Sequence, residues 1–250
     1  MKKLLLSIIA IVITLSCQPK CDDANYLTFK KAKWEVTEIE KGITLKQYHF
    51  QGEEAILESA QYISIIEIDV TAAQKGRWAF ANDPGKITRT SKFAADSGAL
   101  FAMNGTFYNM SLPYNSVSFF RKYGELCYEM NENMGQRDNG AVAIDENGEI
   151  YLVAAPVDSV GMVLDKEWAL GIEEPHVMGS GPLLVYNGEN AYLNEGSFNT
   201  KRHPRSAVAT NDKKIFLITV DGRAPGLADG MSLPEFTRIM NYIGADVPTF

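Results

Sequence analysis

The sequence has few residues of the types that bind transition metals or form disulfides. It contains only 3 cysteines and 3 histidines among 250 residues. The histidines are scattered along the chain, and no Cys-x-x-Cys pair or His-rich stretch occurs. Because zinc sites are built from such closely spaced ligands, we expect neither a metal nor another cofactor. The Gly-x-x-x-x-Gly-Lys motif that cradles nucleotide phosphates is missing as well.

Positive charge is also in short supply, since the formal net charge is −7. An acidic surface repels the phosphates of DNA and RNA, so this balance argues against a nucleic-acid partner. The sequence shows no internal repeat and no low-complexity block. Its length suits one large domain or two small ones.

The sequence contains one long apolar run, and it lies at the N-terminus. Lys2 and Lys3 precede apolar residues 4–15, which end at Ser16-Cys17. The run is too short to span about 30 Å of hydrocarbon as a stable helix. Two lysines, an apolar segment and a small residue before a cut site predict a secretory signal peptide over residues 1–16.

The end of this signal resembles a relaxed lipobox, Thr14-Leu15-Ser16-Cys17. We therefore expect Cys17 to receive a diacylglycerol and to anchor the protein to the membrane of a bacterial cell envelope, in the periplasm or on the outer surface. Residues 17–25 would serve as the tether. A strict lipobox has leucine where Thr14 stands, so cleavage without lipidation is the alternative.

Short apolar runs separated by turn residues predict a protein rich in strands. Residues 62–70 are apolar on both faces, which is typical of a buried central strand. Asn-Gly and similar pairs suit the positive φ angles of tight hairpin turns. On this basis we expect four hairpins, over residues 33–50, 141–154, 182–188 and 206–220.

Two segments have the pattern of helices. Residues 91–97 begin with Ser91 as the expected cap and end at Gly98. Residues 232–243 carry a capping-box pattern of Ser232 and Glu235, an apolar stripe, and Gly244 as the stop. Many hairpin-connected strands with few helices predict an α+β fold with a largely antiparallel sheet.

Candidate binding residues gather in Lys201-Arg202-His203-Pro204-Arg205-Ser206, directly before an expected strand. Arginine presents a planar fork of donors that matches phosphate oxygens, so Arg202 and Arg205 are candidates for phosphate binding. A solvated basic turn is the alternative.

The hairpin over residues 206–220 brings Asp221-Gly222-Arg223 back toward these arginines. Functional residues commonly sit where loops leave a rigid sheet. We therefore expect Asp221 and Arg223 to join Arg202 and Arg205 in one hollow. The alternative is an Asp221–Arg205 ion pair that only closes the hairpin.

Two further segments contain candidate ligand-binding residues. Asn104-Gly-Thr-Phe-Tyr follows an apolar run over residues 99–103, which we expect to be a strand. Asn104 can donate and accept hydrogen bonds to a sugar, although an Asn-Gly turn is the simpler reading. The backbone of Gly179-Ser-Gly-Pro, at Gly179 and Gly181, can cradle an anion.

Taken in order, these motifs resemble the phosphodiester glycosidase family, typified by the mannose 6-phosphate uncovering enzyme. The resemblance rests on Asn104-Gly-Thr-Phe-Tyr, Gly179-Ser-Gly-Pro-Leu-Leu, Arg202-His-Pro-Arg, Val220-Asp-Gly-Arg and residues 226–243. It covers residues 62–245, so we expect this domain over residues 62–250, preceded by a strand-rich extension over residues 26–61. Family members usually continue into a Leu-Asp-Gly-Gly-Gly-Ser loop near the active site. The sequence ends at Phe250 without it, so an incomplete domain and uncertain catalysis are expected.

The resemblance implies a glycoside hydrolase that cleaves the bond between a sugar's anomeric carbon and a phosphodiester, in envelope or host glycans. Fixed arginine donors would stabilise the departing phosphate, namely Arg202, Arg205 and Arg223. Asp221 would assist the attacking water or face the oxocarbenium-like carbon.

His203 would act as a phosphate donor or an acid–base group, and Asn104 would orient the sugar. The alternative function is a non-catalytic lipoprotein that binds phosphorylated or anionic glycans through the same arginines. A structural envelope protein without either activity is the third possibility.

Overall fold

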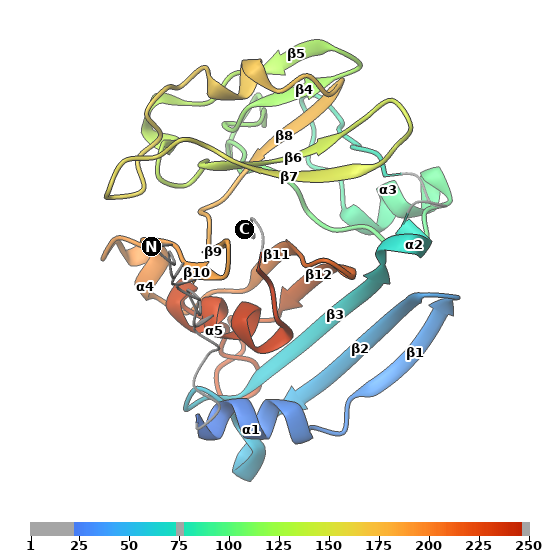
Figure 1. Cartoon of the computed structure of the whole chain (residues 1–250), viewed down its shortest axis with the longest axis vertical. Coiled ribbons are helices and arrows are strands. Elements are labelled where there is room, and N and C mark those ends of the chain that lie inside the picture. The colour runs from blue at the N-terminus through green and yellow to red at the C-terminus, as the bar shows by residue number, and fades with distance from the viewer. Residues whose placement is uncertain (1–22, 74–77, 247–250) are drawn as a thin grey trace, which may run out of the picture.

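The computed structural model describes residues 23–73 and 78–246. The signal peptide, Cys17 and most of the expected tether therefore lie outside the described residues. Two five-stranded antiparallel sheets and five short helices make up the described part (Figure 1). The predicted α+β class is confirmed. Within these residues, no helix has the length and apolar character needed to cross a membrane.

Sheet 1 consists of β1 (Glu35–Glu40), β2 (Ile43–Phe50), β3 (Gln61–Asp69), β12 (Lys214–Val220) and β11 (Arg205–Thr210), in that order. Sheet 2 consists of β5 (Glu125–Tyr128), β4 (Phe120–Lys122), β8 (His176–Ser180), β6 (Gly140–Ile144) and β7 (Ile150–Ala154). A short hairpin pairs β9 (Val185–Tyr186) with β10 (Glu189–Asn190). The segment expected to be a buried central strand is β3, the middle strand of sheet 1.

Five α-helices accompany the sheets: α1 (Ala24–Lys31), α2 (Val70–Ala73), α3 (Thr90–Ser97), α4 (Ser197–Thr200) and α5 (Leu233–Ile243). Single 3-10 turns lie at Gly52–Glu54, Glu132–Met134 and Trp168–Gly171. The apolar residues of α5 and Phe29 of α1 pack in one core with Ile63, Ile65 and Ile218 of sheet 1.

Alternating side chains of sheet 1 fill two apolar layers, because successive residues of a strand point to opposite faces. In β12, Phe216 and Ile218 belong to the core beneath α5 and α1. Leu217, which lies between them in the sequence, belongs to the core shared with Val142 of sheet 2. Sheet 1 is therefore the central layer, with α5 on one face and sheet 2 on the other.

The late helix forms as its sequence predicts. The Ser232 hydroxyl accepts a hydrogen bond from the Glu235 amide at 3.3 Å, and the Glu235 carboxylate accepts one from the Ser232 amide at 2.8 Å. Gly244 ends the helix with a left-handed φ of 76°. This reciprocal bonding satisfies backbone donors that the first turn otherwise leaves free.

Two expectations about local structure are wrong. Ser91 is not the cap of α3, because the helix starts at Thr90 and Arg89 occupies the cap position without a side-chain bond. Residues 99–103 pair with no strand among the described residues. Their apolar character has another origin, since Phe101 and Met103 pack against the core between the sheets while the backbone runs irregularly.

All four predicted hairpins are present, although the one at Asn187-Gly188 is shorter than expected. Its first strand begins only at Val185. The Leu183 amide instead donates to the side-chain oxygen of Asn139 at 2.7 Å, so this amide makes no hydrogen bond to a neighbouring strand. The hairpin of β1 and β2 extends sheet 1, with β2 paired to β3. The helix α1 packs against α5.

Candidate functional site

The register of the β11–β12 hairpin decides which candidate side chains share a face. Arg205 is paired with Val220, and Ser206 is paired with Thr219. Val220 belongs to the core beneath α5, so Arg205 lies on that face as well. Asp221 follows Val220 and lies on the opposite face, toward sheet 2. Arg205 and Asp221 are thus separated by the sheet itself.

A row of polar side chains crosses the sheet-2 face of sheet 1, next to the apolar core. This polar row comprises Gln47, Ser64, Thr219 and Ser206, which are register partners on four strands. The Gln47 amide donates to the Ser64 hydroxyl at 3.0 Å. At the β11 edge, the Ser206 hydroxyl donates to the side-chain oxygen of Asn104 at 2.6 Å. The structure therefore places Asn104 on the same face as Asp221.

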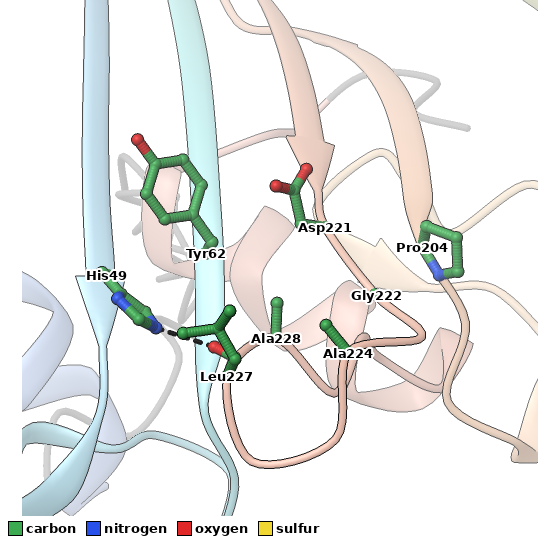
Figure 2. A pocket seen from close by; sticks show the side chains of 8 residues that line it. All are labelled: His49, Tyr62, Pro204, Asp221, Gly222, Ala224, Leu227 and Ala228. Atoms are coloured by element: carbon green, nitrogen blue, oxygen red, sulfur yellow. Dashed lines mark hydrogen bonds between the residues drawn. The ribbon is translucent and has the colours of Figure 1, made fainter.

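Beyond the polar row, the strand ends surround a hollow of about 490 Å³, which we call the Asp221 hollow (Figure 2). Its lining residues are His49, Tyr62, Pro204, Asp221, Gly222, Ala224, Leu227 and Ala228. The Asp221 amide donates to the Tyr62 carbonyl at 3.0 Å. Figure 2 shows the Tyr62 and Asp221 side chains on the same side of these neighbouring strands. A volume of this size suits a small-molecule ligand.

His49 belongs to this hollow, although the sequence did not single it out. Its Nε2 atom lies 2.7 Å from the carbonyl oxygen of Leu227. A carbonyl only accepts hydrogen bonds, so Nε2 carries a proton and donates it to this carbonyl. The alternation of side chains along β2 is the sequence feature that could have indicated His49, because it puts His49 on the face opposite the buried Phe50. Placing His49 at the hollow also requires its pairing with Tyr62 of β3, which the sequence alone does not give.

The glycine of the Val220-Asp-Gly-Arg motif allows the chain to pack closely against the His203-Pro204 segment. A Cβ atom on Gly222 would lie 2.5 Å from the Pro204 nitrogen. A Cβ atom on Gly230, where φ is +85°, would lie 2.5 Å from the His203 carbonyl oxygen. Both positions therefore require glycine.

His203 borders the Asp221 hollow through its neighbour Pro204, but it is not one of the lining residues. Its backbone exchanges two hydrogen bonds with Met231, at 3.1 and 3.0 Å. Burial lowers the pKa of His203, and the cations Arg205, Arg223 and Lys201 lower it further. The imidazole is thus held toward its neutral form in a locally positive field.

Arg202 is bound by the protein itself. Its guanidinium pairs with Glu235 at 2.6 Å and donates to the Leu57 carbonyl at 2.6 Å. The hydrogen bond that Arg202 donates to Glu235 raises the pKa of Arg202 against the effect of burial. Because Glu235 also caps α5, Arg202 ties the start of that helix to the preceding loop.

Arg205 is 7% exposed, and its guanidinium also donates to the protein. Nε donates to the Met231 carbonyl at 2.8 Å, and Nη2 donates to the carbonyls of Phe198 and Lys201 at 2.6 and 3.1 Å. Burial lowers the pKa of Arg205 to about 10. The predicted grouping of Arg202, Arg205 and Asp221 in one hollow is therefore wrong, and no Asp221–Arg205 ion pair forms either.

Arg223 is exposed and directly follows Gly222 of the hollow. Its φ of 63° lies in the left-handed region that non-glycine residues seldom adopt. Such backbone strain occurs often at functional sites, and here it accompanies a cation beside the hollow. Arg223 is thus the predicted arginine that the structure leaves beside Asp221.

The glycines of the Gly179-Ser-Gly-Pro segment make room for residues 137–139. A Cβ atom on Gly179 would lie 2.6 Å from the Asp138 carboxylate. A Cβ atom on Gly181, where φ is +149°, would lie 2.5 Å from the Arg137 carbonyl oxygen. The contacts of Gly179 and Gly181 are therefore with the protein, where an anion cradle was expected.

Asp138 is a buried acid that the sequence did not reveal. It is 1% exposed and accepts a hydrogen bond from the Phe119 amide at 3.3 Å. Burial raises the pKa of Asp138 to about 7 and outweighs the hydrogen bond from the Phe119 amide, which lowers it. Its Oδ1 atom and the Ser118 hydroxyl have no hydrogen-bond partner among the described residues.

Comparison with known proteins agrees with this arrangement of motifs. The sequence profile described as phosphodiester glycosidase matches residues 97–247, which is more than half of the chain. The chain belongs to the phosphodiester glycosidase family. The predicted family resemblance is thus confirmed, and the family is one of hydrolases. A search of curated protein sequences found no match.

Solved structures share the fold at low sequence identity. A Synechocystis protein superposes with a TM-score of 0.62 at 15% identity over 87% of this chain, which spans 57% of that protein. The catalytic domain of zebrafish N-acetylglucosamine-1-phosphodiester alpha-N-acetylglucosaminidase, auto-inhibited by its pro-peptide, has a TM-score of 0.51 at 13% identity. That alignment covers 87% of this chain and 74% of the zebrafish domain.

Proposed function

We propose that this protein hydrolyses a sugar-1-phosphodiester at the bond between the anomeric carbon and the phosphate oxygen. The observation that carries the proposal is the position of Asp221. Its carboxylate borders a hollow on the same face of sheet 1 as the polar row and Asn104. Membership of the phosphodiester glycosidase family supports this reaction class, and so does the name of the zebrafish enzyme.

The chemistry suits these residues. The bond from the anomeric carbon to the phosphate oxygen breaks, and its electron pair leaves with the phosphate monoester. Water adds to the anomeric carbon and loses a proton. Asp221 accepts this proton or stabilises the positive charge that develops on the carbon. Because a phosphate monoester leaves readily, strong protonation of the leaving group is not required.

Binding roles follow from the geometry. Asn104, held by Ser206, presents its amide group to sugar hydroxyls. Arg223 supplies positive charge beside Gly222, and His203 is a donor or acid–base group at the rim. Positive charge and hydrogen-bond donors near the departing phosphate stabilise the negative charge that develops on it.

For the location of the protein we propose export and lipid attachment at Cys17, which rest on the sequence of residues 1–17. The substrate would then be a phosphorylated carbohydrate of the bacterial envelope or of host glycans. Metabolic labelling with a fatty acid tests the anchor: label is expected in the wild type and absent from Cys17→Ser. Equal labelling of both would refute it.

Product analysis in water enriched in heavy oxygen tests the reaction. Wild-type protein is incubated with a synthetic sugar-1-phosphodiester, and the released phosphate monoester is examined by mass spectrometry. Cleavage at the anomeric carbon leaves the phosphate monoester unlabelled. Label in the phosphate would identify a phosphodiesterase, and binding without product would identify a non-catalytic glycan-binding protein.

A further inference from the structure

Two arginines flank one phenylalanine ring beside the Asn104 motif. The guanidinium carbon of Arg137 lies 4.5 Å from the centre of the Phe198 ring, and that of Arg205 lies 4.8 Å from it. Phe107 packs edge-on against the same ring, with 5.6 Å between centres. We call these four residues the Phe198 cluster.

The two arginines differ in how their hydrogen-bond donors are used. Arg205 is buried and donates to three backbone carbonyls through Nε and Nη2. Arg137 is exposed, and its side chain makes no hydrogen bond or ion pair with any residue in 23–73 or 78–246. Stacking on a ring occupies the flat face of a guanidinium and leaves the N–H groups around its edge free. Arg137 thus presents a pre-oriented fork of donors without a protein acceptor.

The backbone that carries Arg137 is fixed. Its carbonyl oxygen packs against Gly181, where no Cβ atom would fit. The next residue, Asp138, is buried against Gly179. The Gly179-Ser-Gly-Pro motif therefore holds the segment that carries the free arginine.

Contacts connect this arginine to the candidate site. Phe107 belongs to the same motif as Asn104, whose side chain bonds to Ser206. Ser206 is paired with Thr219, two residues before Asp221. Arg205, which lies over the same Phe198 ring as Arg137, is also one of the cations that lower the pKa of His203, together with Lys201 and Arg223. A guanidinium whose N–H groups are free attracts an anion.

We propose that Arg137, stacked on Phe198, binds the phosphate group of the substrate, the role that the sequence assigned to Arg202 and Arg205. This inference rests on the proposed function. In this arrangement the sugar lies at Asn104, its anomeric carbon is directed toward Asp221, and the phosphate lies at Arg137. Arg202 and Arg205 support the site from the other face of sheet 1.

Equilibrium binding of two probes tests Arg137 without relying on turnover. The probes are inorganic phosphate, which carries the charge without a sugar, and methyl N-acetylglucosaminide, which carries a sugar without charge. Arg137→Ala is expected to raise the Kd for phosphate about 10- to 100-fold, as for loss of charged hydrogen bonds. The Kd for the neutral glycoside should stay unchanged. Arg137→Lys should recover part of the phosphate affinity, because lysine keeps the charge but not the fork.

The matched control is Arg89→Ala, which removes another exposed arginine side chain, at the cap position of α3. It is expected to bind phosphate as the wild type does, and melting curves of all variants verify folding. The proposal is overturned if wild-type protein binds no phosphate, or if Arg137→Ala binds it as tightly as Arg89→Ala does.

The two proposals fail separately. Phosphate binding that depends on Arg137, without hydrolysis of any sugar-1-phosphodiester, would keep Arg137 as an anion-binding residue and remove the enzymatic function. Hydrolysis with the same KM in Arg137→Ala as in wild type would keep the enzyme and remove this role.

Discussion

The arginine side chains of this protein differ in what they contact. Arg202 and Arg205 both donate to groups of the chain itself, Glu235 for one and backbone carbonyls for the other. Arg137 and Arg223 are exposed beside the motifs of the family. A count of cations in a sequence segment does not distinguish these cases, because the acceptors come from residues distant in sequence. At this scale the free donors, rather than the cluster of cations, indicate where an anion binds.

Asp138 gives a stability prediction at the residue scale. Burial raises its pKa to about 7, whereas an aspartate in the unfolded chain titrates near 3.9. Its proton therefore favours the folded state fully below about pH 4. This contribution is lost as the pH rises through about 7, and it is on the order of 4 kcal/mol.

Urea unfolding of wild type and Asp138→Asn at pH 5 and pH 8.5 checks this. The wild type is expected to lose stability between these values, and the neutral amide should remove most of that loss. Asp212→Asn, at the exposed turn of the β11–β12 hairpin, serves as the control and should keep the wild-type slope. An identical slope for Asp138→Asn would show that Asp138 is ionised in the folded protein.

At the scale of single elements, α5 is specified by its own sequence. Ser232 and Glu235 begin it, an apolar stripe buries it, and Gly244 ends it. Hairpins with Asn-Gly turns are predictable for the same reason, since their signals lie within a few residues. The course of residues 99–103 was not predictable, because an apolar run does not reveal whether a neighbouring strand is available.

The start of α5 also carries the prediction for Arg202. Arg202→Ala leaves the partly buried Glu235 carboxylate without its cation and the Leu57 carbonyl without a donor. We expect the free energy of unfolding to fall by about 1–3 kcal/mol. The KM for a sugar-1-phosphodiester should change little, because Arg202 lies on the α5 face.

Chemical denaturation and steady-state kinetics on the same preparation separate the two roles. The double variant Arg202→Ala/Glu235→Gln should recover part of the lost stability, since it removes the unpaired charge. A large rise in KM with unchanged stability would instead assign Arg202 to the substrate.

At the scale of the whole molecule, the site depends on which face of sheet 1 each side chain occupies. The sequence order of the motifs predicts the family and the α+β class. It also predicts that Asn104 and Asp221 are candidates, and the structure puts both on the sheet-2 face. The two-residue alternation of β12 already implied that Asp221 points away from the core side of Val220. The sequence-based expectation grouped Arg205 with Asp221 because the two residues lie at the same end of the hairpin, and it did not apply the alternation.

His49 and Arg137 show why the rest of the proposed site was not predictable. His49 reaches the hollow through the pairing of β2 with β3, and Arg137 reaches the Asn104 motif through Phe198 of α4. Both relations join segments far apart in sequence. Neither residue stands in a recognisable motif, so packing of the whole chain is needed to reveal them.

The most direct test of the account compares Asp221→Asn with Asp212→Asn in hydrolysis of a synthetic sugar-1-phosphodiester. Both variants make the same chemical change, at opposite ends of the β11–β12 hairpin. Loss of a carboxylate that takes part in the reaction should lower kcat/KM by about 100-fold or more, as expected for general base or charge-stabilising groups. We expect this loss for Asp221→Asn, with wild-type folding, and full activity for Asp212→Asn. Wild-type kcat/KM in Asp221→Asn would contradict the assignment of the Asp221 hollow as the active site.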